Sequence, residues 1–341
     1  MSTTTTPALV AATAPVANRF RAFFAPVNRA TGTPTLFDPA QQGRFALATP
    51  PAPWLDLGWI SAFTRKSASK IGALRTGAPA IVQTQVRTEV EATVSLEFES
   101  WGKLQLAVSS GSEQMNLLVT AAGTNPNGSG GTAETAVPLT LSGSTATTLN
   151  IGTAAAANFT VGQIVAVDLD YTGQTGYLGS GVSAAYVTAS TMVGGDINYI
   201  RRVTLNVARI TAIAAGVLTL GSPLTAGTPT AEMQVSPLAG FCDREGGRYF
   251  QEWSALFVFD GVQGDRILYH YPRLQPLQGA SEITTPLPAT GSSSGSTTGL
   301  AAPLERARLA AAFRALPVAD SNDSAQVLCF RSYLPGPMRS L

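Results

Sequence analysis

Apolar and polar residues alternate from residue 81 onward, most regularly over residues 86–99. Successive side chains of a β-strand point to opposite faces, whereas the same alternation would scatter apolar groups around a helix. The pattern therefore predicts one strand over residues 81–99. Its length would be roughly 60 Å at about 3.3 Å per residue, far beyond the usual ~5–6 residues. The residues predicted to form its core face are Val90, Val94, Leu96 and Phe98.

Weaker patterns predict the other elements. Residues 101–108 and 115–118 indicate a short helix and its exit, and residues 304–316 are ambiguous because Ala, Leu, Arg and Glu favour helix. Pro272 is expected to stop a return strand over residues 266–271, after a turn at residues 260–261. Further strands are predicted at residues 159–171, 202–207, 247–259 and 326–333, and a hairpin at residues 210–220 that turns near Ala215 and Gly216.

Changes in composition predict three segments. Residues 1–60 are rich in Pro, Ala and Thr, which favours an extended arm with small strands. The Gly/Ser stretch at residues 123–131 and the Thr/Gly/Pro stretch at residues 225–230 flank a segment rich in Thr, Gly, Val and Ile. We therefore predict an inserted small β-barrel over residues 123–238. The arm and first half of the main domain occupy residues 1–122, and the second half occupies residues 239–341.

Composition restricts the function classes. Of 341 residues, 45% are hydrophobic and 13% are charged, and the charged share is about half of the typical ~25%. The formal net charge is +1, which argues against a basic nucleic-acid-binding face. No apolar run approaches the ~18 residues of a membrane span. A charge-poor, hydrophobic chain is expected to have apolar surface that must be buried, and a large homo-oligomer buries such surface between its subunits.

Catalytic chemistry has no support in the sequence. The chain has one histidine, His270, and two cysteines, Cys242 and Cys329, too few for a Cys/His zinc site. His270 lacks a nearby nucleophile signature, which favours a structural or interface role. The cysteines could form a single bridge, but two buried thiols are favoured. A formal G-x-G-x-x-A match at residues 179–184 lacks the βαβ context of a dinucleotide site. We expect no enzyme, no cofactor and no metal.

Four segments resemble the tail tube proteins of tailed bacteriophages, the major tail protein family. They are residues 57–64 (LGWISAFT), residues 86–101 with residues 103–107 (KLQLA), residues 253–259 (WSALFVF) and residues 271–274 (YPRL). The resemblance implies a mainly β fold, a β-sandwich or half-barrel with one flanking helix and long strands, here with the inserted β-barrel. It also implies that residues 304–316 form a strand.

The same resemblance implies a structural virion protein. Six copies would form a ring, and stacked rings would form the tube through which genome DNA leaves the virion. The implied partners are other copies of the chain and the tape measure, tail tip and terminator proteins, with no membrane. DNA would cross the lumen without specific binding. The implied location is the virion tail, with the host cytoplasm during assembly.

The charged face of the long strand admits two interpretations. It carries Arg87, Glu89 and Glu91, followed by Glu97 and Glu99. These groups could line the lumen, where like charge keeps DNA from the wall, or the glutamates could pair with arginines of a neighbouring subunit. Two other functions also stay open. One is a related ring protein of a tail tip, baseplate or injection machine, and the other is a β-rich surface adhesin.

Overall fold

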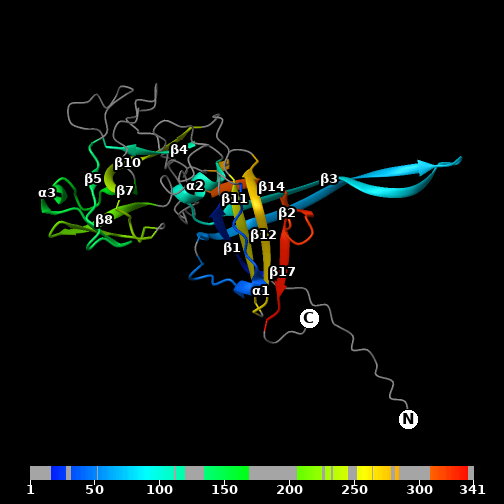
Figure 1. Ribbon diagram of the computed structural model, residues 1–341, viewed down its shortest axis with the longest axis horizontal. Coiled ribbons are helices and arrows are strands. Elements are labelled where there is room, and N and C mark those ends of the chain that lie inside the picture. The colour runs from blue at the N-terminus through cyan, green and yellow to red at the C-terminus, as the bar shows by residue number, and fades with distance from the viewer. Residues whose placement is uncertain are drawn as a thin grey trace, which may run out of the picture.

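The computed structural model is mainly β, with several antiparallel sheets, as the sequence predicts (Figure 1). The structure describes residues 17–27, 32–51, 53–110, 113–119, 134–168, 206–224, 227–231, 233–244, 252–262, 264–277, 281–283 and 308–336. The Gly/Ser stretch at residues 123–131 and the match at residues 179–184 lie outside these ranges. So do most of the strand predicted at residues 202–207 and the first residues of the one predicted at 247–259.

Six antiparallel strands form a closed barrel in the order β14-β3-β2-β1-β11-β12, because β12 also pairs with β14. Short elements extend this barrel: β13 pairs with the start of β14, β17 pairs with the start of β12, and α2 contacts β14. The barrel strands are β1 (Ala17–Pro26), β2 (Leu55–Thr76), β3 (Ile81–Phe98), β11 (Trp253–Gly261), β12 (Arg266–Pro276) and β14 (Arg308–Leu316). The short elements are α1 (Pro39–Gln42), α2 (Lys103–Ser109), β13 (Ser281–Ile283), β15 (Val318–Ala319), β16 (Gln326–Val327) and β17 (Phe330–Leu334).

The barrel interior is a single apolar core. Phe24, Leu57, Phe98, Phe257 and Phe313 belong to it and are each at most 1% exposed. β14 is a strand, as the resemblance implies and against its helical propensity, because its alternate residues enter this core. Burial thus outweighs intrinsic propensity, which is worth only a few tenths of a kcal/mol per residue. The residues of β14 in the core are Leu309, Ala311, Phe313 and Ala315.

A second apolar cluster covers the outer face of the barrel. Residues 33–54, which we call the strap, place Phe37, Phe45 and Trp54 against β1, β11 and β12. β11 is therefore buried on both faces, which explains why its sequence is apolar without a break from Ala255 to Phe259. The prediction of small strands in residues 1–60 is wrong for β1, which pairs along its length with β11 and also with β2. Its apolar residues face both the core and the strap, so the sequence shows no alternation.

Pro272 does not end β12, contrary to the prediction. β12 continues to Pro276, and the register between β11 and β12 shifts beside Pro272, where Trp253 pairs with Leu274 and Ala255 pairs with Tyr271. Proline lacks the N–H that a ladder bond needs, so a bulge is a site where a sheet tolerates it. The Ser254 hydroxyl donates to the Pro272 carbonyl at 2.8 Å and so supports the strand there.

Within residues 113–244, the described strands form a second sheet with its own core, beside the barrel (Figure 1). The segment at residues 115–118 is strand β4 rather than a helix exit, because it pairs with β10. This pairing extends the second sheet beyond residues 123 and 238 at both ends. The predicted hairpin at residues 210–220 is confirmed and turns at Ala215 and Gly216, both at positive φ. The elements are β4 (Glu113–Leu118), β5 (Val137–Pro138), β6 (Thr148–Asn150), α3 (Thr153–Ala156), β7 (Ile164–Asp168), β8 (Val207–Ala214), β9 (Val217–Leu220) and β10 (Gln234–Arg244).

Candidate assembly interface

β2 and β3 continue far beyond the barrel as a two-stranded ribbon (Figure 1). β1 pairs with β2 only as far as Ile60, and β14 pairs with β3 only from Thr93 onward. We call residues 61–76 and 81–92 the ribbon. Within the described residues, each ribbon strand has no pairing partner except the other, so both outer edges are open. The ribbon confirms the predicted long strand, which runs from Ile81 to Phe98.

The position of Val90 corrects the predicted core face. Val94, Leu96 and Phe98 are buried as predicted, at 0%, 3% and 1% exposure, but Val90 is 44% exposed. The alternation that places Val90 in line with Val94 is present, but the barrel ends at Ala92. The alternation within one strand predicts which side chains share a face. Which of these side chains are buried depends on how far the neighbouring strands extend beside it.

The ribbon exposes many large apolar side chains. Single scattered apolar residues are normal on a protein surface, whereas a group of them on one element marks an interaction site. The group on the ribbon comprises Ile71 (62% exposed), Leu74 (60%), Ile81 (60%), Val82 (41%), Val86 (59%) and Val90 (44%). The ribbon is therefore a surface that the barrel of the same chain leaves uncovered.

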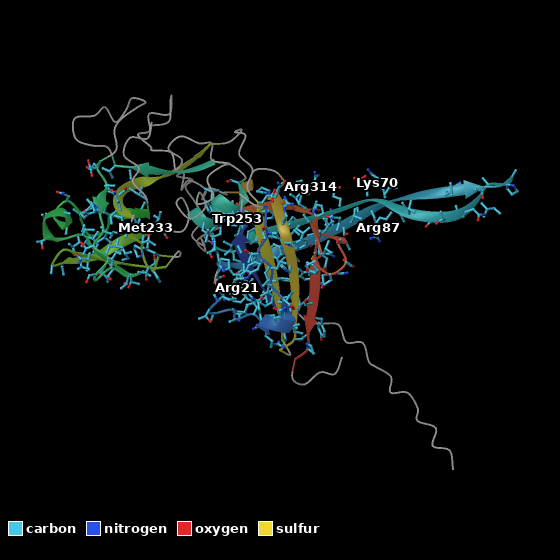
Figure 2. All side chains as sticks on the ribbon, viewed as in Figure 1. Arg21, Lys70, Arg87, Met233, Trp253 and Arg314 are labelled. Atoms are coloured by element: carbon cyan, nitrogen blue, oxygen red, sulfur yellow. The ribbon has the colours of Figure 1, made fainter. Side chains whose placement is uncertain are left out.

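A β-bulge at Thr88 divides the predicted charged face. Lys70 pairs with Glu89 and Ile71 pairs with Arg87, so Thr88 is an extra residue in β3. Its hydroxyl donates to the Lys70 carbonyl at 3.2 Å. Directly paired residues share a face and consecutive β2 residues alternate, so Arg87 lies on the face opposite Glu89 and Glu91. Figure 2 shows Lys70 and Arg87 along the ribbon and Arg314 near its root.

The glutamates of the long strand form ion pairs within the chain. Lys70 Nζ lies 2.5 Å from Glu89 Oε2, and Arg314 Nη2 lies 2.9 Å from Glu91 Oε1. Arg308 lies 3.6 Å from Glu97. The side chains of Glu89 and Glu91 are 51% and 44% exposed, so each pair contributes at most ~1 kcal/mol. These contacts offer a third account of the glutamates, beside a lumen wall and pairing between subunits.

Arg65 fixes the root of the ribbon to the barrel. Its Nε donates to the Tyr271 hydroxyl at 2.8 Å, and Cys329 packs against the same core. Burial raises the pKa of the Tyr271 phenol, with the nearby Cys329 adding to the rise, and burial also raises the pKa of Cys329. Both groups therefore stay protonated at neutral pH, and Cys329 is a free thiol without the thiolate character that nucleophilic chemistry needs. Sequence reasoning missed this contact, because 206 positions separate Arg65 from Tyr271.

His270 is buried between the strap and the barrel. It is 3% exposed, its Nε2 lies 3.3 Å from the Thr35 carbonyl oxygen, and its ring makes an edge contact with Trp54. Burial lowers the pKa of His270 to about 4, so the imidazole is neutral at pH 7. It borders a half-open cavity of about 360 Å³ between the strap, β12 and β17. The described residues contain no group of three metal-ligating side chains.

Comparison with known proteins gives no family: no protein-family model and no curated protein matches this chain. Among the described residues, no helix is both long enough and apolar enough to cross a membrane.

Proposed function

We propose that this chain is a structural subunit of a bacteriophage tail tube, which assembles through its ribbon into hexameric rings that stack around a DNA channel. The observation that carries the proposal is the ribbon itself, with its open edges and exposed apolar side chains. Covering a Val, Leu or Ile side chain stabilises by about 1.5–3 kcal/mol when burial is complete. Six such side chains, each 41–62% exposed, supply part of that stabilisation to an assembly.

Open strand edges support the same function. An edge of this length is a template for uncontrolled pairing, and natural proteins cover such edges or close them into barrels. A ring in which each ribbon lies against neighbouring subunits covers both the edges and the apolar side chains. The resemblance in residues 57–64, 86–101 with 103–107, 253–259 and 271–274 supports the tail tube as the particular assembly. The tape measure, tail tip and terminator proteins are the further proposed partners.

Glu89 and Glu91 are proposed to face the channel, and Arg87, on the opposite face of the ribbon, is proposed to face the interface beside it. The pairs Lys70–Glu89 and Arg314–Glu91 neutralise this part of the ribbon, so it offers DNA little net charge to hold. DNA would then pass without specific binding. The proposed location is the virion tail, after assembly in the host cytoplasm, and no catalytic step is part of the proposal.

Negative-stain microscopy and light scattering of the purified chain test this function. We expect rings that stack into tubes, with a mass that rises with concentration. A variant that lacks residues 68–91, closed by a short Gly/Ser turn, keeps the pairing of Ser67 with Ala92 and the barrel-paired parts of β2 and β3. It should remain folded and monomeric. Wild-type protein that stays monomeric at every concentration would contradict the proposal. Rings that never stack would favour a tail-tip or baseplate ring instead.

The second sheet should be dispensable for assembly. It has its own apolar core of residues such as Leu149, Ile210 and Leu218, and it joins the barrel through the paired strands β4 and β10. We expect that replacing residues 120–236 with a short Gly/Ser turn, which retains the pairing of Leu118 with Leu238, leaves rings intact by microscopy. Loss of the folded barrel by circular dichroism would show that the second sheet is part of the main core.

A further inference from the structure

The outer half of the ribbon is apolar on both faces. Two register shifts in β3 reverse which of its residues point to each face of the ribbon. The first is the bulge at Thr88. The second is at Gln83, since Leu74 pairs with Thr84 and Arg75 pairs with Val82. Ile71, Val82 and Val90 therefore share the face that continues the barrel interior. Leu74, Ile81 and Val86 share the opposite face. Without the bulges, strict alternation would place Val82, Val86 and Val90 together on one side.

This arrangement has a geometric consequence. A ribbon that lies on one surface covers one face and leaves the other in water. In residues 71–76 and 81–87, one face carries Ile71 and Val82 and the other carries Leu74, Ile81 and Val86, with exposures of 41–62%. Covering either face alone would therefore leave large apolar side chains in water on the other. Only enclosure on both faces removes all five from water, so the apolar surface favours two contacts over one.

We propose that the outer half of the ribbon, residues 71–76 and 81–87, is clasped between two other copies of this chain, one against each face. The inference deepens the proposed function and rests on it, since it names the partner surfaces of the ribbon within the assembly. A single neighbour would suffice for a ribbon with one apolar face, and this ribbon has two.

Charge complementarity indicates that the partner on the face of Ile71 and Val82 is a copy of the same chain, because Arg75 and Arg87 lie on that face. Residues 71–88 contain Arg75 and Arg87 and no Asp or Glu, so the outer ribbon is basic as well as apolar. The barrel offers a complementary receptor in the cavity of about 360 Å³ beside the strap. The cavity combines apolar residues with carboxylates, and its lining includes Leu256, Leu268, Phe330, Asp38 and Asp320.

Both carboxylates can accept a further hydrogen bond. Asp38 Oδ1 accepts from the Ala40 N–H at 2.8 Å, and Asp320 Oδ1 accepts from the Asn322 N–H at 2.9 Å. Among the described residues, each local turn uses one carboxylate oxygen, which leaves the second oxygen for an incoming guanidinium. Arginine suits this role because its charge is permanent and its donors match a carboxylate. The receptor for one face of the ribbon is thus the cavity of a second copy.

Variants on each face of the ribbon test the clasp. Ile71→Lys and Val86→Lys change exposed side chains on opposite faces, and Ile71→Val and Val86→Ile are matched controls that keep each position apolar. We expect each Lys variant alone to need at least about tenfold more protein than wild type to form rings in light scattering, while both controls assemble normally. Circular dichroism should show unchanged folding for all four, because none of these side chains is in the core.

The outcomes separate the clasp from the proposed function. Wild-type rings together with normal assembly of either Lys variant would mean that the ribbon contacts one neighbour, which overturns the clasp and leaves the ring intact. Normal assembly of both Lys variants with altered DNA passage would assign the ribbon to DNA and also overturns the clasp. A monomeric wild type would instead overturn the proposed function on which the clasp rests.

A double-mutant cycle tests the second copy as receptor. Arg75→Gln and Asp320→Asn each remove one charge while keeping a hydrogen-bonding side chain at the position. If the two groups meet between copies, each variant alone should raise the protein concentration needed for rings by about tenfold, and the combined variant should cost no more than either one. Independent, multiplicative effects would overturn the pairing of Arg75 with the cavity.

Discussion

Replacing Phe98 with alanine should destabilise the isolated chain by roughly 3–5 kcal/mol. Phe98 is 1% exposed and pairs directly with Ile60 on one side and Leu309 on the other. Its ring fills the barrel where β2, β3 and β14 meet, so truncation removes apolar contacts and leaves a cavity. A domain has a total stability of only about 5–15 kcal/mol, so this loss approaches the threshold of unfolding.

The matched control for Phe98 lies on the same strand. Val90 belongs to the same face by alternation, but it is 44% exposed, so Val90→Ala should cost about 1 kcal/mol or less in the dissociated chain. Urea unfolding, followed by circular dichroism at concentrations below assembly, measures both variants. Equal losses for Phe98→Ala and Val90→Ala would mean that the barrel continues past Ala92 and that the ribbon packs on its own chain.

The two strands of the ribbon differ in how far the sequence predicts them. β3 matches the predicted strand within one residue, because its apolar and polar positions alternate over the buried part. The sequence does not predict its partner β2 as a strand, since Arg65, Lys66, Ser67, Ala68 and Ser69 include no strong β-former. These residues are strand because β3 supplies their hydrogen-bonding partner, and strand propensity depends on that context.

The bulges limit prediction of the interface. The sequence around Thr88 has no glycine or proline to mark an irregularity, and unbroken alternation assigns Arg87 and Glu89 to one face. The register with β2 separates them. The ion pairs Lys70–Glu89 and Arg314–Glu91 and the contact between Arg65 and Tyr271 likewise join strands that only the folded chain brings together. The sequence thus predicts the long strand β3 and its alternating positions, but not how the side chains of the ribbon are distributed over its two faces.

The burial of His270 by the strap is a second feature that the sequence does not predict. The sequence predicts a structural or interface histidine from the absence of catalytic partners, and the structure places it in a buried, neutral state. What the sequence lacks is the cause of that burial. Trp54 and the Thr35 carbonyl, more than 200 positions away, cover the imidazole. This burial gives the protein a definite response to acid.

Acid should weaken the folded barrel through His270. Its pKa is about 4 in the folded chain, against 6.5 in the unfolded chain. Because folding lowers the pKa of His270, its full contribution to the free energy of unfolding is present above pH 6.5. That contribution is lost as the pH falls through 6.5 toward 4. The unfolded imidazole takes up a proton over this range while the folded one resists it. At 1.36 kcal/mol per pKa unit, the loss amounts to about 3 kcal/mol below pH 4.

His270→Leu removes this titration and keeps an apolar side chain against Trp54 and Phe330. Asp38 and Asp320 border the same cavity, and they remain in both proteins, as do all other carboxylates. The comparison therefore isolates most of the imidazole's share of acid unfolding. Free energies of unfolding measured by urea at pH 7 and pH 4 should fall by about 2–3 kcal/mol more in the wild type than in His270→Leu. Equal falls in the two proteins would mean that the strap opens readily and that His270 titrates in contact with water.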